Sequence, residues 1–255
     1  MQRAVTHAAA VAAATRLTAF AAVVTLAAAA SPAAAQYEGA DATYRASRVT
    51  VGGGFFVAQP VGEFKNYVDN GVGGGGHVLL RLDPRGILAL RGDVGYLLYG
   101  HETKRVSLPD VGRVQLDVTT SNNIVTYSVG PQLMVPSGPI RPYVNAQMGG
   151  AYFFTQSSVG GSDTDWGFAS TRNFGDNVAS YGYGGGVFVP LAVRNAFVGV
   201  DLGARFIRNG HTRYLREGGI TDLPGGGYTI SPIESETNLV VYHLGVSVGV
   251  RSRQR

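Results

Sequence analysis

Residues 240–250 read VVYHLGVSVGV, a stretch in which large apolar side chains alternate with smaller or polar ones. On an extended chain, one face would carry Val240, Tyr242, Leu244, Val246, Val248 and Val250. The opposite face would carry Val241, His243, Gly245, Ser247 and Gly249. A period of two is typical of a β-strand whose two faces meet different surroundings. This stretch therefore predicts a strand with one strongly apolar face.

The same alternation recurs upstream, at residues 49–58, 77–83, 88–99, 126–135, 144–154, 180–189 and 198–206. With the last stretch, this predicts eight strands. Glycine accounts for 37 of the 255 residues, about twice its ordinary share, which argues against a helical domain. After residue 35 no apolar run approaches the length of a membrane-spanning helix. If the chain crosses a membrane, it must do so with strands.

The connections between these stretches alternate in length. Residues 84–86, 136–140 and 191–195 form short links, whereas residues 60–70, 102–112, 156–176 and 209–235 form long ones. Short periplasmic turns that alternate with long outer loops are characteristic of outer-membrane barrels. We therefore predict an all-β fold over residues 47–251, an eight-stranded antiparallel up-and-down transmembrane β-barrel.

The first 35 residues have the pattern of a secretory signal peptide. Arg3 and Arg16 precede an apolar segment from Leu17 to Ala30, and small residues up to Ala35 provide a cleavage site. We expect export through the Sec route with cleavage after Ala35, and localisation in a bacterial outer membrane. Residues 36–46 would then be a short N-terminal segment and residues 252–255 a C-terminal tail.

Charge and composition argue against several other functions. The chain has 21 Lys and Arg and 17 Asp and Glu; without Arg3 and Arg16 the mature part has 19 against 17, so no basic face for nucleic acid is expected. The absence of cysteine excludes disulfides and thiolate metal sites. The mature histidines show no metal-ligand spacing, and we expect no metal and no cofactor.

Charged side chains fall on the less apolar face of several predicted strands. An eight-stranded barrel has an interior just wide enough for side chains to fill, and charges inside it must be paired or hydrated. We expect a structural charge network there, with a proton or ion path as the alternative. Arg91-Gly92-Asp93 resembles an adhesion triplet, but its place inside a strand favours charge pairing. The expected network comprises Arg81, Asp83, Arg91, Asp93, Asp201, Arg205 and His243.

Three short motifs in order add a resemblance to a known family. They are Pro60-Val61-Gly62-Glu63-Phe64, Gly130-Pro131-Gln132-Leu133 and Arg141-Pro142-Tyr143-Val144. In this order the chain resembles the small eight-stranded outer-membrane barrels that include the OmpA and OmpX barrels. Such barrels usually end in an aromatic residue read by the barrel-insertion machinery, whereas this chain ends in Arg255. The strand at 240–250 is then the candidate for that signal.

The resemblance implies a monomeric barrel in contact with outer-membrane lipids and lipopolysaccharide. Some barrels of this architecture are lipid A deacylases or palmitoyltransferases, but no His-x-Ser arrangement like that of the deacylases is present, so no catalytic residue is assigned. We expect a non-enzymatic structural or surface-interaction role, with an unidentified surface ligand as a candidate partner. The alternatives are a narrow pore, a lipid A-modifying enzyme and a soluble lipocalin-like ligand binder. Candidate loop contacts are Trp166, Phe168, Phe174, Tyr214 and Tyr228.

Overall fold

The computed structural model describes residues 47–108, 111–161, 169–193, 196–223 and 227–251. The predicted signal peptide, the segment 36–46 and the tail 252–255 lie outside these residues. Eight long strands dominate the described part: β1 (Ser47–Pro60), β2 (Gly71–Arg81), β3 (Leu88–Leu108), β4 (Val111–Met134), β5 (Arg141–Gly161), β6 (Ala169–Val193), β7 (Ala196–Asn209) and β12 (Leu239–Arg251).

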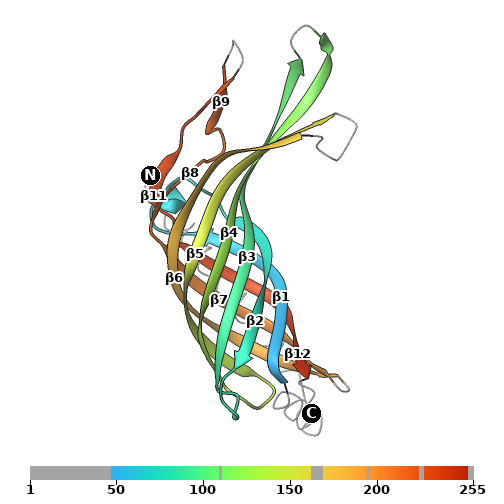
Figure 1. The fold of residues 1–255 in the computed structure, drawn as a ribbon, viewed down its shortest axis with the longest axis vertical. Helices are drawn as coiled ribbons and strands as arrows, with labels where there is room; N and C mark the ends of the chain where they lie inside the picture. The colour runs from blue at the N-terminus through green and yellow to red at the C-terminus, as the bar shows by residue number, and fades with distance from the viewer. Residues whose placement is uncertain (1–46, 109–110, 162–168, 194–195, 224–226, 252–255) are drawn as a thin grey trace, which may run out of the picture. The chain divides into compact units, whose positions relative to one another are not determined.

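The eight long strands form one closed antiparallel barrel. Each pairs with its predecessor, and β12 closes the ring between β7 and β1, as Figure 1 shows. Closure pairs the backbone N–H and C=O groups that would otherwise be free at a sheet edge. The predicted eight-stranded antiparallel up-and-down barrel is confirmed. No helix in the described ranges is long and apolar enough to cross a membrane.

The two ends of the barrel differ. At one end, here called the turn end, Ser47 pairs with Arg251 and short turns join β2 to β3 and β4 to β5. Each of those turns contains a glycine at positive φ, Gly86 at 80° and Gly138 at 99°, a region that L side chains rarely adopt. The opposite end, here called the hairpin end, carries the long connections (Figure 1).

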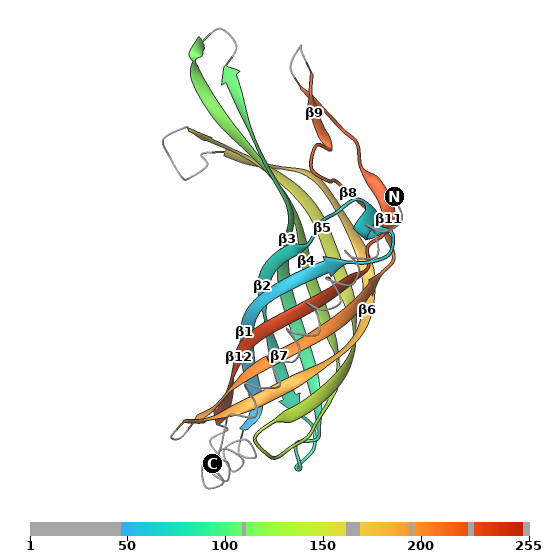
Figure 2. The same ribbon diagram turned by 180° about the vertical axis from the view of Figure 1, so that it is seen from behind.

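The long connections contain more strand than the sequence predicts. β3 and β4 stay paired up to Leu108 and Val111, and β5 and β6 up to Val159 and Ala169, so the described parts of the long connections expected at 102–112 and 156–176 continue the strands as hairpins. The last connection holds two small hairpins (Figure 2), β8 (His211–Tyr214) with β11 (Ile233–Glu236) and β9 (Ile220–Asp222) with β10 (Tyr228–Ile230). These segments lack the apolar alternation that predicts the eight barrel strands.

The faces of the strands are inverted relative to a water-soluble barrel. Outward side chains are apolar and exposed, among them Val94 at 61%, Met148 at 71% and Tyr183 at 64%. Inward charged residues are buried, with Arg91 and Asp201 each 2% exposed. The alternative of a soluble barrel with its Val and Leu face inward does not fit these faces, because a water-soluble protein keeps its apolar face in the core.

Inward glycines make room for bulkier interior groups. A Cβ on Gly75 of β2 would overlap the carbonyl oxygen of Val94 and lie 2.7 Å from the ring of Phe56. The glycine run before the predicted 77–83 strand is thus part of β2 itself. It lets the chain curve closely around the interior.

Three layers fill the interior. Near the hairpin end, an apolar cluster includes what we call the aromatic plug, formed by Phe64, Tyr99, Phe153 and Tyr214. Phe64 comes from a 3₁₀ turn, η1 (Phe64–Asn66), that follows β1. Polar and charged side chains occupy the middle, and a smaller apolar cluster near the turn end includes Met134, Phe188 and Phe197.

Candidate functional site

The middle layer is centred on a bridging arginine. Arg91 and Asp93 point inward from β3 because residues two apart share a strand face. Arg91 Nε donates to both carboxylate oxygens of Asp93, at 3.0 and 2.9 Å. Its Nη1 donates to Oε1 of Gln132 on β4 at 3.0 Å. The Arg91-Gly92-Asp93 triplet is therefore engaged inside the barrel and is not presented at a loop tip.

Asp93 forms the first of two acidic centres. Besides Arg91, it accepts a hydrogen bond from Nη2 of Arg205 at 3.0 Å, which brings β7 to β3 across the interior. Gln147 on β5 donates to the same carboxylate. Charge-assisted hydrogen bonds of this kind are stronger than neutral ones, so this carboxylate ties three strands together.

Asp201 on β7 forms the second centre. Tyr143 donates its hydroxyl to Asp201 Oδ1 at 2.7 Å, and His243 Nε2 lies 3.3 Å from the same oxygen. Arg91 Nη1 is 3.6 Å from Oδ2, and His77 Nε2 is 3.9 Å from it. Arg91 thus contacts both carboxylates.

The charges within this layer balance. Two carboxylates, Asp93 and Asp201, face two guanidinium groups, Arg91 and Arg205. Burying an unpaired charge costs several kcal/mol, so the pairing makes a charged interior tolerable. We call this group, with its neutral partners, the interior polar cluster. Its members are Arg91, Asp93, Asp201, Arg205, His243, Gln132, Tyr143, Gln147 and His77.

Five of the seven residues expected in the charge network meet there: Arg91, Asp93, Asp201, Arg205 and His243. Asp83 does not. It lies in the β2–β3 turn, where its carboxylate accepts hydrogen bonds from the backbone N–H groups of Arg85 and Leu88 at 3.0 and 2.7 Å. Arg81 lies at the end of β2 beside Ala89, nearer the turn end than the cluster. The predicted strand ran two residues too far, which placed Asp83 inside.

Several members of the cluster carry no charge and were not expected as site residues. Gln132, Tyr143 and Gln147 complete the hydrogen bonds of the ions, and Ser247 bonds His77 at 3.1 Å. The alternation of side chains along each strand gives the available signal, because each of these residues lies on the inward face that it shares with a charged residue or a glycine. A search restricted to charged side chains passes over them.

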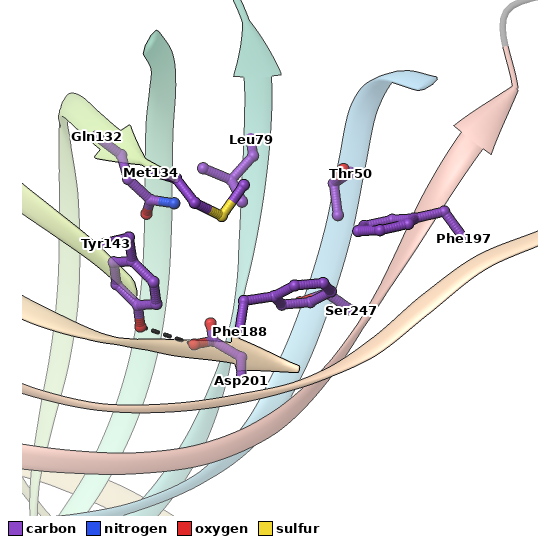
Figure 3. A pocket seen from close by; sticks show the side chains of 9 residues that line it. All are labelled: Thr50, Leu79, Gln132, Met134, Tyr143, Phe188, Phe197, Asp201 and Ser247. Atoms are coloured by element: carbon purple, nitrogen blue, oxygen red, sulfur yellow. Dashed lines mark hydrogen bonds between the residues drawn. The ribbon is translucent and has the colours of Figure 1, made fainter. Parts of the chain in front are cut away.

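A small cavity lies on the turn-end side of the cluster. Tyr143, Asp201 and Gln132 line one part of it, and Met134, Phe188 and Phe197 another; Figure 3 shows the Tyr143–Asp201 hydrogen bond at its wall. Within the described ranges, no three His, Cys, Asp or Glu side chains are arranged to hold a metal ion. The arrangement is suited to cross-linking strands through polar contacts.

The candidate loop contacts are placed in different environments. Trp166 and Phe168 lie outside the described residues. Phe174 packs under the guanidinium of Arg213, at 5.7 Å. Tyr214 is fully buried in the aromatic plug, so it is not a surface contact. Tyr228, in β10, is 53% exposed.

Comparison with known proteins gives similarity at the level of structure. No family model matches the chain, and no curated protein sequence matches it. Among solved structures, it is similar to Ail, the attachment invasion locus protein of Yersinia pestis, at 9% identity over 79% of this chain and 97% of that chain, with a TM-score of 0.40.

The chain is also similar to two further solved structures. Neisserial surface protein A is 15% identical over 80% of this chain and 98% of its own, with a TM-score of 0.42. The N-terminal β-barrel domain of Pseudomonas aeruginosa OprF is 13% identical over 80% and 98%, with a TM-score of 0.31. The barrel itself is established by its closed strand pairing.

Proposed function

We propose that the chain is a monomeric, non-enzymatic outer-membrane barrel with a structural or surface-interaction role. The observation that carries this proposal is the inverted polarity of the strands. Outward side chains such as Val94 and Met148 are exposed and apolar, whereas Arg91 and Asp201 are buried. Lipid around the barrel accounts for the first feature, and a closed sheet satisfies the backbone as a hydrocarbon environment requires.

The filled interior favours a structural role over a narrow pore. The aromatic plug crosses the barrel near the hairpin end, where Phe64 packs edge to face on Tyr99, Phe153 and Tyr214 at ring-centroid distances of 5.9, 6.0 and 5.0 Å. The interior polar cluster fills the next layer. A pore would require both layers to open, so we expect no conductance in planar bilayers.

The positions of Ser235 and His211 at the hairpin end favour a non-enzymatic role over a hydrolase. Ser235 of β11 is buried and hydrogen-bonds the hydroxyl of Tyr214 at 3.0 Å. His211 of β8 is exposed, on the opposite face of the same small hairpin. A general base must reach its nucleophile, and these two residues face apart. Unchanged lipid A mass on expression in a suitable host would agree with this proposal.

The hairpin end supplies the surface for interaction. We propose that it faces outward, where outer loops are long, and that lipopolysaccharide surrounds its base. Tyr228 and the exposed parts of the β3–β4 and β5–β6 hairpins could then meet a surface ligand. The insertion machinery would read the apolar face of β12, which carries Tyr242 and Leu244 outward.

The proposal is tested by membrane fractionation and gel mobility. Unboiled protein in SDS should migrate faster than boiled protein, because a closed barrel resists the detergent, and the protein should be found in the outer-membrane fraction. A soluble periplasmic protein without a mobility shift would overturn the proposal. The intact mass of the purified protein tests the export step, with the expected value corresponding to a chain that begins at Gln36.

A further inference from the structure

Five polar and aromatic side chains gather on the outside of the barrel near the hairpin end. They lie on the outward faces of β3, β4, β5 and β6, which are consecutive neighbours in the sheet (Figure 2). This surface, the exterior patch, comprises Tyr96, Asn123, Tyr152, Phe154 and Arg172.

The rings of the exterior patch hold Arg172 in place. Tyr152 and Phe154 are stacked, with centroids 5.4 Å apart and ring planes at 16°. The guanidinium of Arg172 lies 5.4 Å from the first ring and 5.5 Å from the second. Its Nη1 donates to the hydroxyl of Tyr152 at 3.1 Å. Cation–π contacts of this kind orient the planar group.

The neighbouring strands extend this ordered surface. Tyr96 hydrogen-bonds Asn123 at 2.5 Å, and its ring lies 6.4 Å from that of Phe154. Gly175 leaves room for the Tyr152 ring, because a Cβ there would overlap its hydroxyl. The side chain of Arg172 is therefore held on a preformed support.

Arg172 differs from two other outward arginines in whether a carboxylate pairs with its guanidinium. Arg208 lies 6.0 Å from the ring of Tyr181 but also pairs with Glu236 at 3.6 Å. Arg105 pairs with Asp117 at 3.1 Å. Among the described residues, no carboxylate lies within ion-pair distance of Arg172. Of the five N–H donors of a guanidinium, one is used by Tyr152, so an anion can be bound.

The height of the patch on the barrel indicates the kind of anion. Outward residues of β5 from Val144 to Phe154 span about 33 Å along the strand, or about 25 Å along the barrel axis at the usual tilt. That is the height of the apolar band of an outer-membrane barrel. Arg172 thus lies at the hairpin-end edge of the band, where the headgroups of the outer leaflet begin.

We propose that the exterior patch binds a phosphate group of lipid A, with Arg172 as the cation and Tyr152 and Phe154 as its support. This inference rests on the proposed function, since it requires the barrel to lie in an outer membrane with its hairpin end outward. The acyl chains of the lipid would lie along the apolar outer faces of β4 and β5, where Val125 and Met148 point outward.

Native mass spectrometry of the full chain in detergent micelles tests the proposal. The probes are lipid A and the same lipid A from which both phosphates have been removed. We expect the wild-type protein to bind the phosphorylated form more tightly and Arg172→Gln to bind it about tenfold more weakly, the effect of losing one charge-assisted hydrogen bond. Tyr152→Phe should weaken binding less, because both rings remain and only the hydroxyl is lost.

Arg208→Gln is the matched control, since it removes an outward arginine that rests on a tyrosine but has its own carboxylate. It should bind lipid A as the wild type does. Equal binding by wild type and Arg172→Gln, or equal weakening in Arg208→Gln, would overturn the proposal. Full displacement by inorganic phosphate would also do so, because it would show a general anion site. A normal gel mobility shift in Arg172→Gln would leave the proposed function standing in each case.

Discussion

The aromatic plug and the interior polar cluster fill adjacent layers of the same narrow barrel by different means. The plug relies on four rings, two of which, Phe64 and Tyr214, come from outside the eight barrel strands. The cluster relies on side chains of the strands themselves, joined by directional hydrogen bonds. Both layers are almost entirely buried, so the difference between them is one of chemistry and not of exposure.

This difference predicts different responses to mutation. Apolar contacts are non-directional, and the loss of one ring removes burial and leaves a cavity. In the cluster, the loss of one ion leaves another buried without its partner, which costs more than the interaction itself contributed. The cluster should therefore fix the relative register of its strands, whereas the plug should mainly seal the hairpin end.

The largest effect is expected from Arg91→Met. The substitution leaves Asp93 with one arginine and Asp201 without its guanidinium contact, so two buried carboxylates lose compensation. We expect the free energy of unfolding to fall by about 4 kcal/mol. Urea-induced unfolding of the protein in lipid vesicles, followed by gel mobility, measures this change. A loss no greater than that of an isolated apolar truncation would contradict the assigned role of Arg91.

A second variant separates the charge imbalance from the lost contacts. Asp93→Asn combined with Arg205→Leu removes one charge of each sign, so no ion is left alone. Because balanced removal of a buried pair is often close to neutral, the double variant should be more stable than the sum of its single variants predicts. Strict additivity would show that Asp93 and Arg205 do not act as a pair.

Phe64→Ala is the next largest perturbation and tests the plug. Phe64 is completely buried and contacts three other rings, so its truncation should cost about 3 kcal/mol. Phe64→Leu should cost less, since most of the volume remains. The same unfolding assay applies. If Phe64→Ala proved harmless, the η1 turn would not be part of the barrel core, and the comparison between the two layers would fail.

The barrel could be predicted from the sequence because its outward face is regularly apolar. The alternation in residues 144–154 and 240–250 follows directly from an outward apolar face, and the observed faces match it. The continuations of β3 to Leu108 and of β6 from Ala169 carry Thr, Ser and charged residues on both faces. A strand that does not lie in an apolar environment needs no apolar face. These continuations therefore show no alternation of apolar and polar residues.

The interior site was predictable in part for a similar reason. The alternation along the strands predicts the inward orientation of four charged residues, Arg91, Asp93, Asp201 and Arg205. It does not predict which of their strands face one another across the barrel. The sequence shows Tyr143 only as part of a family motif, and the closed barrel brings its hydroxyl to Asp201. Tyr214 lies in a long connection, so the sequence predicts an exposed contact; its burial depends on the pairing of β8 with β11 at the hairpin end of the barrel.

Tyr99→Phe should produce a smaller effect and sharpen the account of the plug. The hydroxyl of Tyr99 donates to the backbone carbonyl of Leu215 at 3.0 Å and so ties the last connection to β3. Its loss should cost about 1 kcal/mol and speed tryptic cleavage at the exposed Arg216. Tyr127→Phe, which changes an outward tyrosine, is the control. Equal protease sensitivity in both variants would show that the hydrogen bond does not hold the connection.

The smallest effect on the free energy of unfolding is expected at Asp83, which tests whether a turn carboxylate contributes to acid sensitivity. Slight desolvation raises the pKa of Asp83, but backbone hydrogen bonds, led by that from Leu88, outweigh it and lower the pKa below its ordinary 3.8. A lowered pKa in the folded state means that the carboxylate contributes stability above pH 3.8 and loses it as the pH falls through the lower folded value. Asp83→Asn should therefore unfold slightly more easily than wild type in neutral buffer, and this difference should shrink as the pH falls below 3.8 and vanish below the folded-state pKa. A difference that persisted undiminished in acid would contradict the assignment of the effect to the charged Asp83, because the protonated side chain no longer accepts these bonds as a carboxylate.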